Sequence, residues 1–285
     1  RRPHAGARDA RPATQARPPR EPADNWLYGR HAVAAALANP ERRWRRLAIL
    51  SGHEAEAQAL LAAARAQRRG PRVDRRVEIT GAAVEVLDRA AFNLLLPEGA
   101  VHQGWALAVE PLDPPDLDDV LRAADVAPGS SGGRQVIVVL DQVTDPHNVG
   151  AVLRSAAAFG AAAVIIAGHG APPVGGALAK AASGALDCVP LVRVVNLARA
   201  LLRLKEAGYW CCGLDEGAPA PLAALDLGAR VVLVLGSEGG GLRRLLRERC
   251  DYLARLPTRP ALPSLNVSNA AAIALYELVR AEPAG

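Results

Sequence analysis

The stretch QVIVVLDQVTDPHNVGAVLRSAAAFGAAAVIIAG, residues 135–168, carries most of the information about the fold. It opens with the apolar run QVIVVL, crosses a polar loop and an alanine-rich segment that ends at Gly160, and closes with the apolar run AAVIIAG. Short continuous apolar runs are typical of strands that are buried on both faces. The order strand, helix, strand therefore predicts a parallel sheet that is covered by helices.

The same alternation continues toward the C-terminus. Ligands bind such sheets at the C-terminal ends of the strands, so the loops DQVTDPHNVG (141–150), GSEGGG (236–241) and LPTRPALPSLNVS (256–268) are the candidate site. We expect further strands at VPLVRV (189–194), YWCCGLD (209–215), RVVLVLG (230–236) and YLARLP (252–257), and helices near LAKAAS (178–183) and over NLARALLRLKEAG (196–208).

Upstream, a second alternation of strands and helices predicts a small α/β domain. Gly29 separates a short apolar segment from a helix in WLYGRHAVAAAL (26–37). Strands are expected at 46–50, 77–80 and 105–112, with helices over 54–68 and from the second strand through Leu87. The predicted division is a disordered basic tail (1–24), the small domain (25–112), an acidic and Pro/Gly/Ser-rich linker (113–133) and the large domain (134–285).

The composition is that of a globular protein: 285 residues, of which 50% are hydrophobic and 22% are charged. No apolar run is long enough for a membrane span and no signal-peptide core is recognisable, so a cytoplasmic location is expected. The four cysteines lack paired C-x-x-C spacing, which predicts reduced buried thiols and no metal.

Positive charge is concentrated at the front of the chain. Residues 1–23 hold six arginines against Asp9 and Glu21, and RRWRR (42–46) and RRGPRVDRR (68–76) add further clusters. Although such runs are commonly solvated surface, this distribution makes a nucleic acid the leading candidate partner.

The glycine-rich GSEGGG fits none of the common glycine motifs. No G-K-[ST] follows it, it lacks G-x-G-x-x-G spacing, and Leu235 stands where a nucleophile elbow needs glycine, so Ser237 is not a nucleophile. A plain strand-to-helix turn, with a helix starting near Leu242, is the alternative. That alternative leaves Glu238 unexplained at the end of a strand.

Taken together, the three loops resemble the SpoU family of the SPOUT class. The residues that carry the resemblance are N-x-G-x-x-x-R-x-x-A-x-F-G from Asn148, GSEGGG after a strand, and LNVS after Pro257; LYGRHAV, VHQGWALAV and NLARALLRLKEAGYWCCGLD extend it over the ordered chain. The family consists of RNA ribose 2′-O-methyltransferases that use S-adenosylmethionine. The resemblance is strongest to the branch that methylates a guanosine of 23S-type ribosomal RNA, and it implies a small α/β RNA-binding domain ahead of a parallel-sheet domain with a deep trefoil knot.

The resemblance also implies site residues. Arg154 would stabilise the 2′-hydroxyl as its proton leaves, and its alternative is a surface arginine. Asn148 would orient the substrate, or else cap the helix that starts near Val149. Glu238 would anchor the arginine or the substrate, or else face a helix dipole. Ser264 and Asn266 would position the ribose, whereas in the alternative Ser268 or Asn269 simply caps a helix.

S-adenosylmethionine would be held mostly by backbone groups, with Leu265 and Val267 directed toward the core. His147 is interpreted as a turn residue, and His102 and Gln103 as loop-shaping or RNA-contacting. A homodimer is implied because active sites of the family are completed across the subunit interface. A tRNA target and a non-catalytic ribosome-assembly factor stay as alternatives. The residues implied to bind the cofactor are Leu235, Gly236, Gly239, Leu256, Leu265 and Val267.

Overall fold

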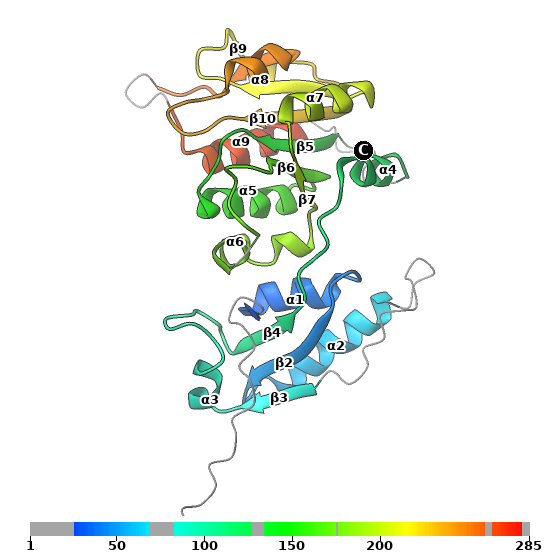
Figure 1. The fold of residues 1–285 in the computed structure, drawn as a ribbon, viewed down its shortest axis with the longest axis vertical. Helices are drawn as coiled ribbons and strands as arrows, with labels where there is room; N and C mark the ends of the chain where they lie inside the picture. Colours follow the sequence, from blue (N-terminus) through cyan, green and yellow to red (C-terminus); the bar gives the residue numbers. More distant parts are fainter. Residues whose placement is uncertain (1–25, 69–82, 127–133, 175, 260–263, 281–285) are drawn as a thin grey trace, which may run out of the picture.

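The computed structural model describes residues 26–68, 83–126, 134–174, 176–259 and 264–280. The predicted basic tail, most of RRGPRVDRR and the strand predicted at 77–80 lie outside these residues. The chain forms a small and a large α/β unit, joined by the segment between β4 and α4 (Figure 1).

The small unit is a four-stranded sheet in the order β1-β4-β2-β3. β4 is central and all of its residues are buried, because alternate side chains face the two sides of the sheet. Trp105, Leu107 and Val109 pack against α1 and α2, whereas Ala106 and Ala108 pack with Phe92 of α3. The elements are β1 (Trp26–Tyr28), α1 (Arg30–Ala38), β2 (Trp44–Leu50), α2 (Glu54–Arg68), β3 (Ala83–Leu87), α3 (Arg89–Asn93) and β4 (Trp105–Val109).

The helix predicted through Leu87 is wrong, because residues 83–87 form strand β3 parallel to β2. In AVEVL, Val84 and Val86 alternate with Glu85, which is a period-two pattern of the kind that fits a strand. Glu85 faces Arg46 of β2, and the two side chains form a double hydrogen bond of 3.0 and 2.7 Å. The strand is thus fixed by pairing with a segment far away in the sequence.

The large unit is a seven-stranded sheet in the order β7-β6-β5-β10-β8-β11-β9, and every pairing in it is parallel. This confirms the predicted parallel sheet. Its strands are β5 (Gln135–Leu140), β6 (Ala163–Ala167), β7 (Leu191–Val194), β8 (Trp210–Leu214), β9 (Ala220–Pro221), β10 (Arg230–Leu235) and β11 (Tyr252–Arg255).

Helices cover both faces of the large sheet, and each face has its own core. The first core joins Val136, Val138 and Leu140 to α5, α6 and α9; the second joins Ile137 and Val139 to α4, α7 and α8. The helix α4 lies within the predicted linker, yet its Val120 and Leu121 belong to this second core. The helices are α4 (Leu117–Val126), α5 (Pro146–Ala158), α6 (Gly176–Ala182), α7 (Leu197–Glu206), α8 (Arg244–Arg249) and α9 (Val267–Arg280), with short 3-10 turns η2 (Ala185–Asp187) and η3 (Leu222–Ala224).

The trefoil knot that the resemblance implies depends on the path between β11 and α9. Residues 260–263 of that path lie outside the described residues, so the knot stays a prediction.

Candidate functional site

In the loop after β5, another residue caps helix α5, so the side chain of Asn148 is available for other contacts. The side chain of Asp145 accepts a hydrogen bond of 2.9 Å from the backbone N–H of His147, and Pro146 occupies the first helical turn. Asp145 is therefore the N-cap, and the alternative in which Asn148 caps the helix is wrong. His147 is exposed in the first turn of α5, so its interpretation as a turn residue is wrong.

Asn148, Glu238 and Asn266 meet in one hydrogen-bonded cluster. Nδ2 of Asn148 donates to Oε1 of Glu238 at 3.0 Å, and Nδ2 of Asn266 donates to Oδ1 of Asn148 at 3.1 Å. Asn266 also donates to Glu238 Oε1. These residues follow β5, β10 and β11, so the carboxyl ends of three strands contribute one side chain each. The sheet thereby unites three of the five predicted catalytic residues.

Asn266 also caps helix α9. Its Oδ1 accepts from the backbone N–H groups of Ser268 at 2.9 Å and Asn269 at 3.4 Å. The alternative in which Ser268 or Asn269 caps the helix is therefore wrong. Glu238 Oε1 accepts a longer bond of 3.4 Å from the N–H of Val267, which places this carboxylate at the N-terminus of α9.

The turn that presents Glu238 needs its glycines. A Cβ atom on Gly236 would lie 2.0 Å from the carbonyl carbon of Gly241, so no other residue fits there. The N–H of Gly241 donates to the carbonyl of Ser237 at 2.9 Å, and Gly239 has a φ of 76°, in the left-handed region. The backbone of this turn is thus folded tightly and stays accessible at Gly239 and Gly240.

An ion pair with a buried carboxylate, which the sequence did not reveal, holds the far end of this turn. Asp141, directly after β5, is fully buried, and its Oδ1 accepts from Nε of Arg243 at 2.8 Å. Its Oδ2 accepts from the backbone N–H of Arg243 at 2.9 Å. The loops after β5 and β10 are therefore linked by a charged contact between residues 102 positions apart. Only the position of an acidic residue at the end of a strand hinted at it.

Arg154 lies away from the cluster. It is an exposed residue of α5, six positions after Asn148, which places the two side chains about 120° apart around the helix axis. Within the described residues, no hydrogen bond or ion pair engages its guanidinium. The structure therefore does not unite Arg154 with Glu238 of the same chain.

The predicted cofactor residues line the ends of β10, β11 and the start of α9. Leu235 and Val267 are buried, at 2% and 5% exposure, whereas Leu256 and Leu265 are partly buried. Ser264 and Asn266 are exposed and alternate with Leu265 and Val267, as expected for an extended segment.

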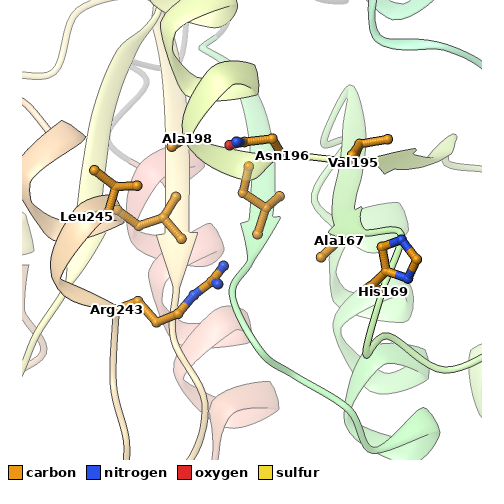
Figure 2. Close-up of a pocket in the computed structure, with 9 residues that line it drawn as sticks. Ala167, His169, Val195, Asn196, Ala198, Arg243 and Leu245 are labelled. Carbon is orange, nitrogen blue, oxygen red and sulfur yellow. The ribbon is translucent and has the colours of Figure 1, made fainter.

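Two adjacent cavities open elsewhere at this edge of the sheet. The larger, of about 270 Å³, lies at the ends of β6 and β7, and the smaller, of about 130 Å³, shares Ala167, His169 and Arg243 with it. Figure 2 shows Arg243 reaching into the larger cavity from one side and His169 standing at the other. Of the described residues, none that was predicted to bind the cofactor lines either cavity.

The loop of the small domain at His102 and Gln103 has a structural role. Gln103 adopts a φ of 52°, and its side-chain oxygen accepts from the N–H of Arg30 at 3.2 Å. Nδ1 of His102 accepts from the N–H of Gly104 at 3.0 Å. Both side chains thus shape the loop ahead of β4, in line with the loop-shaping interpretation.

No cluster of three or more histidine, cysteine or acidic residues suited to a metal ion occurs among the described residues. Within that same part of the chain, no helix is long and apolar enough to cross a membrane.

Comparison with known proteins identifies the family. The SpoU rRNA methylase family matches residues 135–276, and an RNA 2′-O ribose methyltransferase substrate binding domain matches residues 26–115. The 23S rRNA (guanosine-2′-O-)-methyltransferase RlmB of Xylella fastidiosa strain 9a5c is 39% identical over 260 residues, which cover 90% of this chain and 96% of that protein. The chain belongs to the SpoU rRNA methylase family.

Further relatives agree with SpoU membership. RlmB of Pseudomonas aeruginosa is 40% identical over 89% of this chain and 95% of its own length. The SpoU methyltransferase AviRb of Streptomyces viridochromogenes has the same fold, with a TM-score of 0.67 at 24% identity, covering 90% of this chain and 89% of AviRb. AviRb has also been solved in complex with AdoMet, and that structure has a TM-score of 0.64 at 25% identity, covering 90% of each chain. The resemblance seen in the sequence motifs is thus confirmed, and so is the fold class that it implied apart from the knot.

Proposed function

We propose that this chain transfers a methyl group from S-adenosylmethionine to the 2′-hydroxyl of a guanosine ribose in 23S-type ribosomal RNA. Relatives named as 23S rRNA guanosine 2′-O-methyltransferases match nearly the full chain at 37–40% identity. The observation that carries the proposal is the cluster of Asn148, Glu238 and Asn266, in which the three family loops meet. Because such an enzyme works where ribosomal RNA is made, the proposal retains the expected cytoplasmic location.

The chemical problem in this reaction is the ribose hydroxyl. S-adenosylmethionine supplies a methyl group that is already activated by the positive charge on sulfur. The 2′-hydroxyl is a poor nucleophile until its proton leaves or its developing negative charge is stabilised. A guanidinium has no atom that accepts a proton, so Arg154 acts through its charge, stabilising the incipient alkoxide and gripping a neighbouring phosphate that can accept the proton.

Glu238 is arranged to orient these groups. Every hydrogen bond that it accepts from the described residues ends on Oε1. Its Oε2 can therefore accept from an arginine or from a ribose hydroxyl. Ser264 and Asn266 lie on the exposed side of the same extended segment and would position the ribose.

The residues present fit S-adenosylmethionine. The turn at Gly236 and Gly239 offers backbone groups with no side chain in the way, and the partly buried Leu256 and Leu265 offer apolar walls for an adenine ring. Leu235 and Val267 complete the base of this site. We assign these residues to the cofactor.

We further propose that the active enzyme is a homodimer whose subunits meet through α5 and α9. α9 exposes Ile273 and Tyr276 at 46% and 54%, and Phe159, just after α5, lies 6.1 Å from Tyr276 between ring centroids. An apolar surface of this kind is suited to an isologous contact. The partner subunit's Arg154 would then reach the Glu238 cluster, which explains why Arg154 points away from it within one chain.

Incubation with labelled S-adenosylmethionine tests the function. Unmodified 23S rRNA and tRNA transcripts are offered separately, with Arg154→Ala as the inactive control. Label that enters 23S rRNA alone and is lost in the variant supports the proposal. Label in tRNA would replace the target, and cofactor binding without transfer to either RNA or to assembling ribosomal particles would favour the assembly-factor alternative.

A further inference from the structure

Residues 183–187, which the site does not use, form part of the surface on which the small unit rests. Gly184 has a φ of 90°, and a Cβ atom placed on it would lie 3.0 Å from Cα of Ala32 and 3.1 Å from the carbonyl oxygen of His31. Helix α1 therefore packs directly on the backbone at Gly184. In Figure 1, α1 is the part of the small unit that faces α6 and the turn after it.

A buried ion pair crosses this surface. Nε of Arg42 donates to Oδ1 of Asp187 at 2.8 Å, and Nη2 donates to Oδ2 at 3.1 Å. The side chains of Arg42 and Asp187 are only 6% and 1% exposed. This is the two-pronged geometry in which arginine binds a carboxylate with a defined orientation.

Further hydrogen bonds complete the contact. Nδ2 of Asn39 donates to Oδ1 of Asp187 at 3.0 Å, and Nη1 of Arg42 donates to the carbonyl oxygen of Glu110 at 2.9 Å. Asn39 itself ends helix α1, with its N–H bonded to the carbonyl of Ala35. One carboxylate of the large unit thus receives three donors from a turn of the small unit. We call Asn39, Arg42 and Asp187 the interdomain clamp.

A buried pair of this kind contributes orientation more than stability. Removing two charges from water costs about as much as their attraction returns, so the gain lies in fixing one geometry. The covalent link between the two units is residues 110–116, between β4 and α4. Units joined by a short link and a modest interface move relative to one another by default. The clamp supplies the restraint that the link lacks.

The clamp is also connected to the candidate active site. Its turn η2 follows α6, which packs tightly on α5: a Cβ atom on Gly150 would lie 2.4 Å from Cβ of Ala181. Helix α5 carries Asn148 and Arg154. The contact that orients the small unit is therefore packed, through α6, on the helix that carries the proposed catalytic groups.

We propose that Asp187 is a positioning residue: through Arg42 and Asn39 it holds the RNA-binding unit at the orientation in which bound RNA reaches the methyl-transfer site. This inference rests on the proposed function, because RNA is the substrate whose approach is controlled. Asp187 does not touch that substrate, since its side chain is buried against Arg42.

Replacement of Asp187 by asparagine distinguishes a positioning role from a purely electrostatic one, because the two roles change the affinity for RNA in opposite directions. Asparagine keeps the shape and one acceptor but removes a negative charge, so a purely electrostatic role predicts tighter binding of a polyanion. Loss of positioning predicts the opposite. We expect Asp187→Asn to raise the KM for rRNA about tenfold, to leave kcat within about threefold, and to leave the affinity for S-adenosylmethionine unchanged.

Two further variants sharpen the test. Arg42→Gln should match Asp187→Asn, and the double variant should be no worse than either single one, because the residues act as a unit. Arg45→Gln is the matched control: it removes an arginine three positions away whose side chain is 57% exposed. Its effect on KM should stay below about threefold and fade at high salt, whereas the effect of Asp187→Asn should persist, because a buried pair is screened little.

Hydrogen exchange of the whole chain tests the clamp without requiring methyl transfer. Asp187→Asn should speed exchange of the amides in α1 and in residues 184–188, and Arg45→Gln should not. An unchanged or lowered KM in the Asp187→Asn variant overturns the positioning role, even if exchange increases. If the wild-type protein methylates no RNA, the proposed function is wrong. If hydrogen exchange in the Asp187→Asn variant equals that of the wild-type protein, the clamp is refuted independently of the function.

Discussion

At the residue scale, Asn266 has two contacts that one substitution can separate. Its Oδ1 caps helix α9, and its Nδ2 donates to Asn148 and Glu238. Asn266→Asp keeps an oxygen for the cap but has no N–H to donate and brings a second carboxylate to Glu238. We expect methyl transfer to fall about 100-fold, which is the usual cost of losing one aligned donor at an active site. The free energy of unfolding, measured by thermal denaturation, should change by no more than about 1 kcal/mol, because both carboxylates are exposed and their repulsion is screened.

Asn266→Ala is the comparison for that variant. It removes the cap as well as the donor, so its free energy of unfolding should fall by a further ~1 kcal/mol. Its loss of methyl transfer should equal that of the Asn266→Asp variant. Near wild-type transfer by the Asn266→Asp variant would show that the hydrogen bond from Asn266 to Glu238 has no role in the reaction.

The meeting of the three loops could be predicted from the strand pattern and their polar residues from the family resemblance, but the helix caps could not. Asn148, Glu238 and Asn266 each follow a strand of a parallel sheet, and the carboxyl ends of such strands meet at one edge. The caps depend on the residue at which each helix begins, and sequence patterns fix that point only to within a few positions. That is why Asp145 and Asn266 took the capping roles expected for their neighbours.

At the element scale, the turn between β10 and α8 depends on Arg243. Removing its side chain in Arg243→Ala leaves Asp141 buried with one backbone donor and no counter-charge. We expect a loss of about 2 kcal/mol in the free energy of unfolding, less than for a fully buried pair because half of the arginine side chain is in water. Denaturant unfolding measures this loss.

The neighbouring Arg244→Ala supplies the control for Arg243. Its side chain is 90% exposed and pairs with Glu248 one turn away, so its removal should change stability by less than about 0.5 kcal/mol. Equal effects of the two substitutions would contradict the anchoring role of Arg243.

The thiols near β8 and α8 give a prediction about pH. Burial raises the pKa of Cys211, Cys212 and Cys250 to about 12. In the unfolded chain these thiols ionise near pH 9, whereas in the folded chain they stay neutral, so stability should fall as the pH rises from about 9 toward 12 and be unaffected below that window. At pH 8 a thiol reagent should modify Cys188 alone in the native protein, and all four cysteines after denaturation. Rapid modification of a second native thiol would contradict this burial.

The positions of most strands and helices in the large unit followed from apolar runs, because buried parallel strands differ clearly from their loops, whereas the order of the strands in the sheet was not predicted. β3 was less accessible to such reasoning. Its five residues AVEVL lie in an alanine-rich region, and what makes them a strand is pairing with β2 and the contact between Arg46 and Glu85. A short edge strand takes its structure from its partner.

At the scale of the whole molecule, the sequence predicted two units but not their relation. The clamp joins Arg42 to a residue 145 positions away, and the turn that carries Asp187 has no periodic pattern. The pairing of Asp141 with Arg243 was hidden for the same reason. Contacts between distant single residues leave no trace in local composition, whereas sheets and helices do.

The proposed homodimer predicts that two inactive variants restore activity when they share a dimer. If each active site combines Asn148 and Glu238 of one subunit with the partner subunit's Arg154, then Arg154→Ala and Glu238→Gln should each be inactive alone. Mixed by unfolding and refolding together, half of the dimers pair one variant with the other, and each such dimer has one site with both residues intact. We expect about a quarter of wild-type methyl transfer to return, because that is the share of sites restored by random pairing.

Two controls test whether the recovered activity depends on dimer formation. Tyr276→Glu, placed on the exposed side of α9, should yield monomers by light scattering and abolish transfer without unfolding the chain, since a charge disrupts an apolar contact but is tolerated on a free surface. Introduced into both partners of the mixing experiment, it should also abolish the recovery. If the mixed variants stay inactive although they form mixed dimers, Arg154 acts within its own subunit. Its position about 120° around α5 from Asn148 would then require RNA to bridge the two groups.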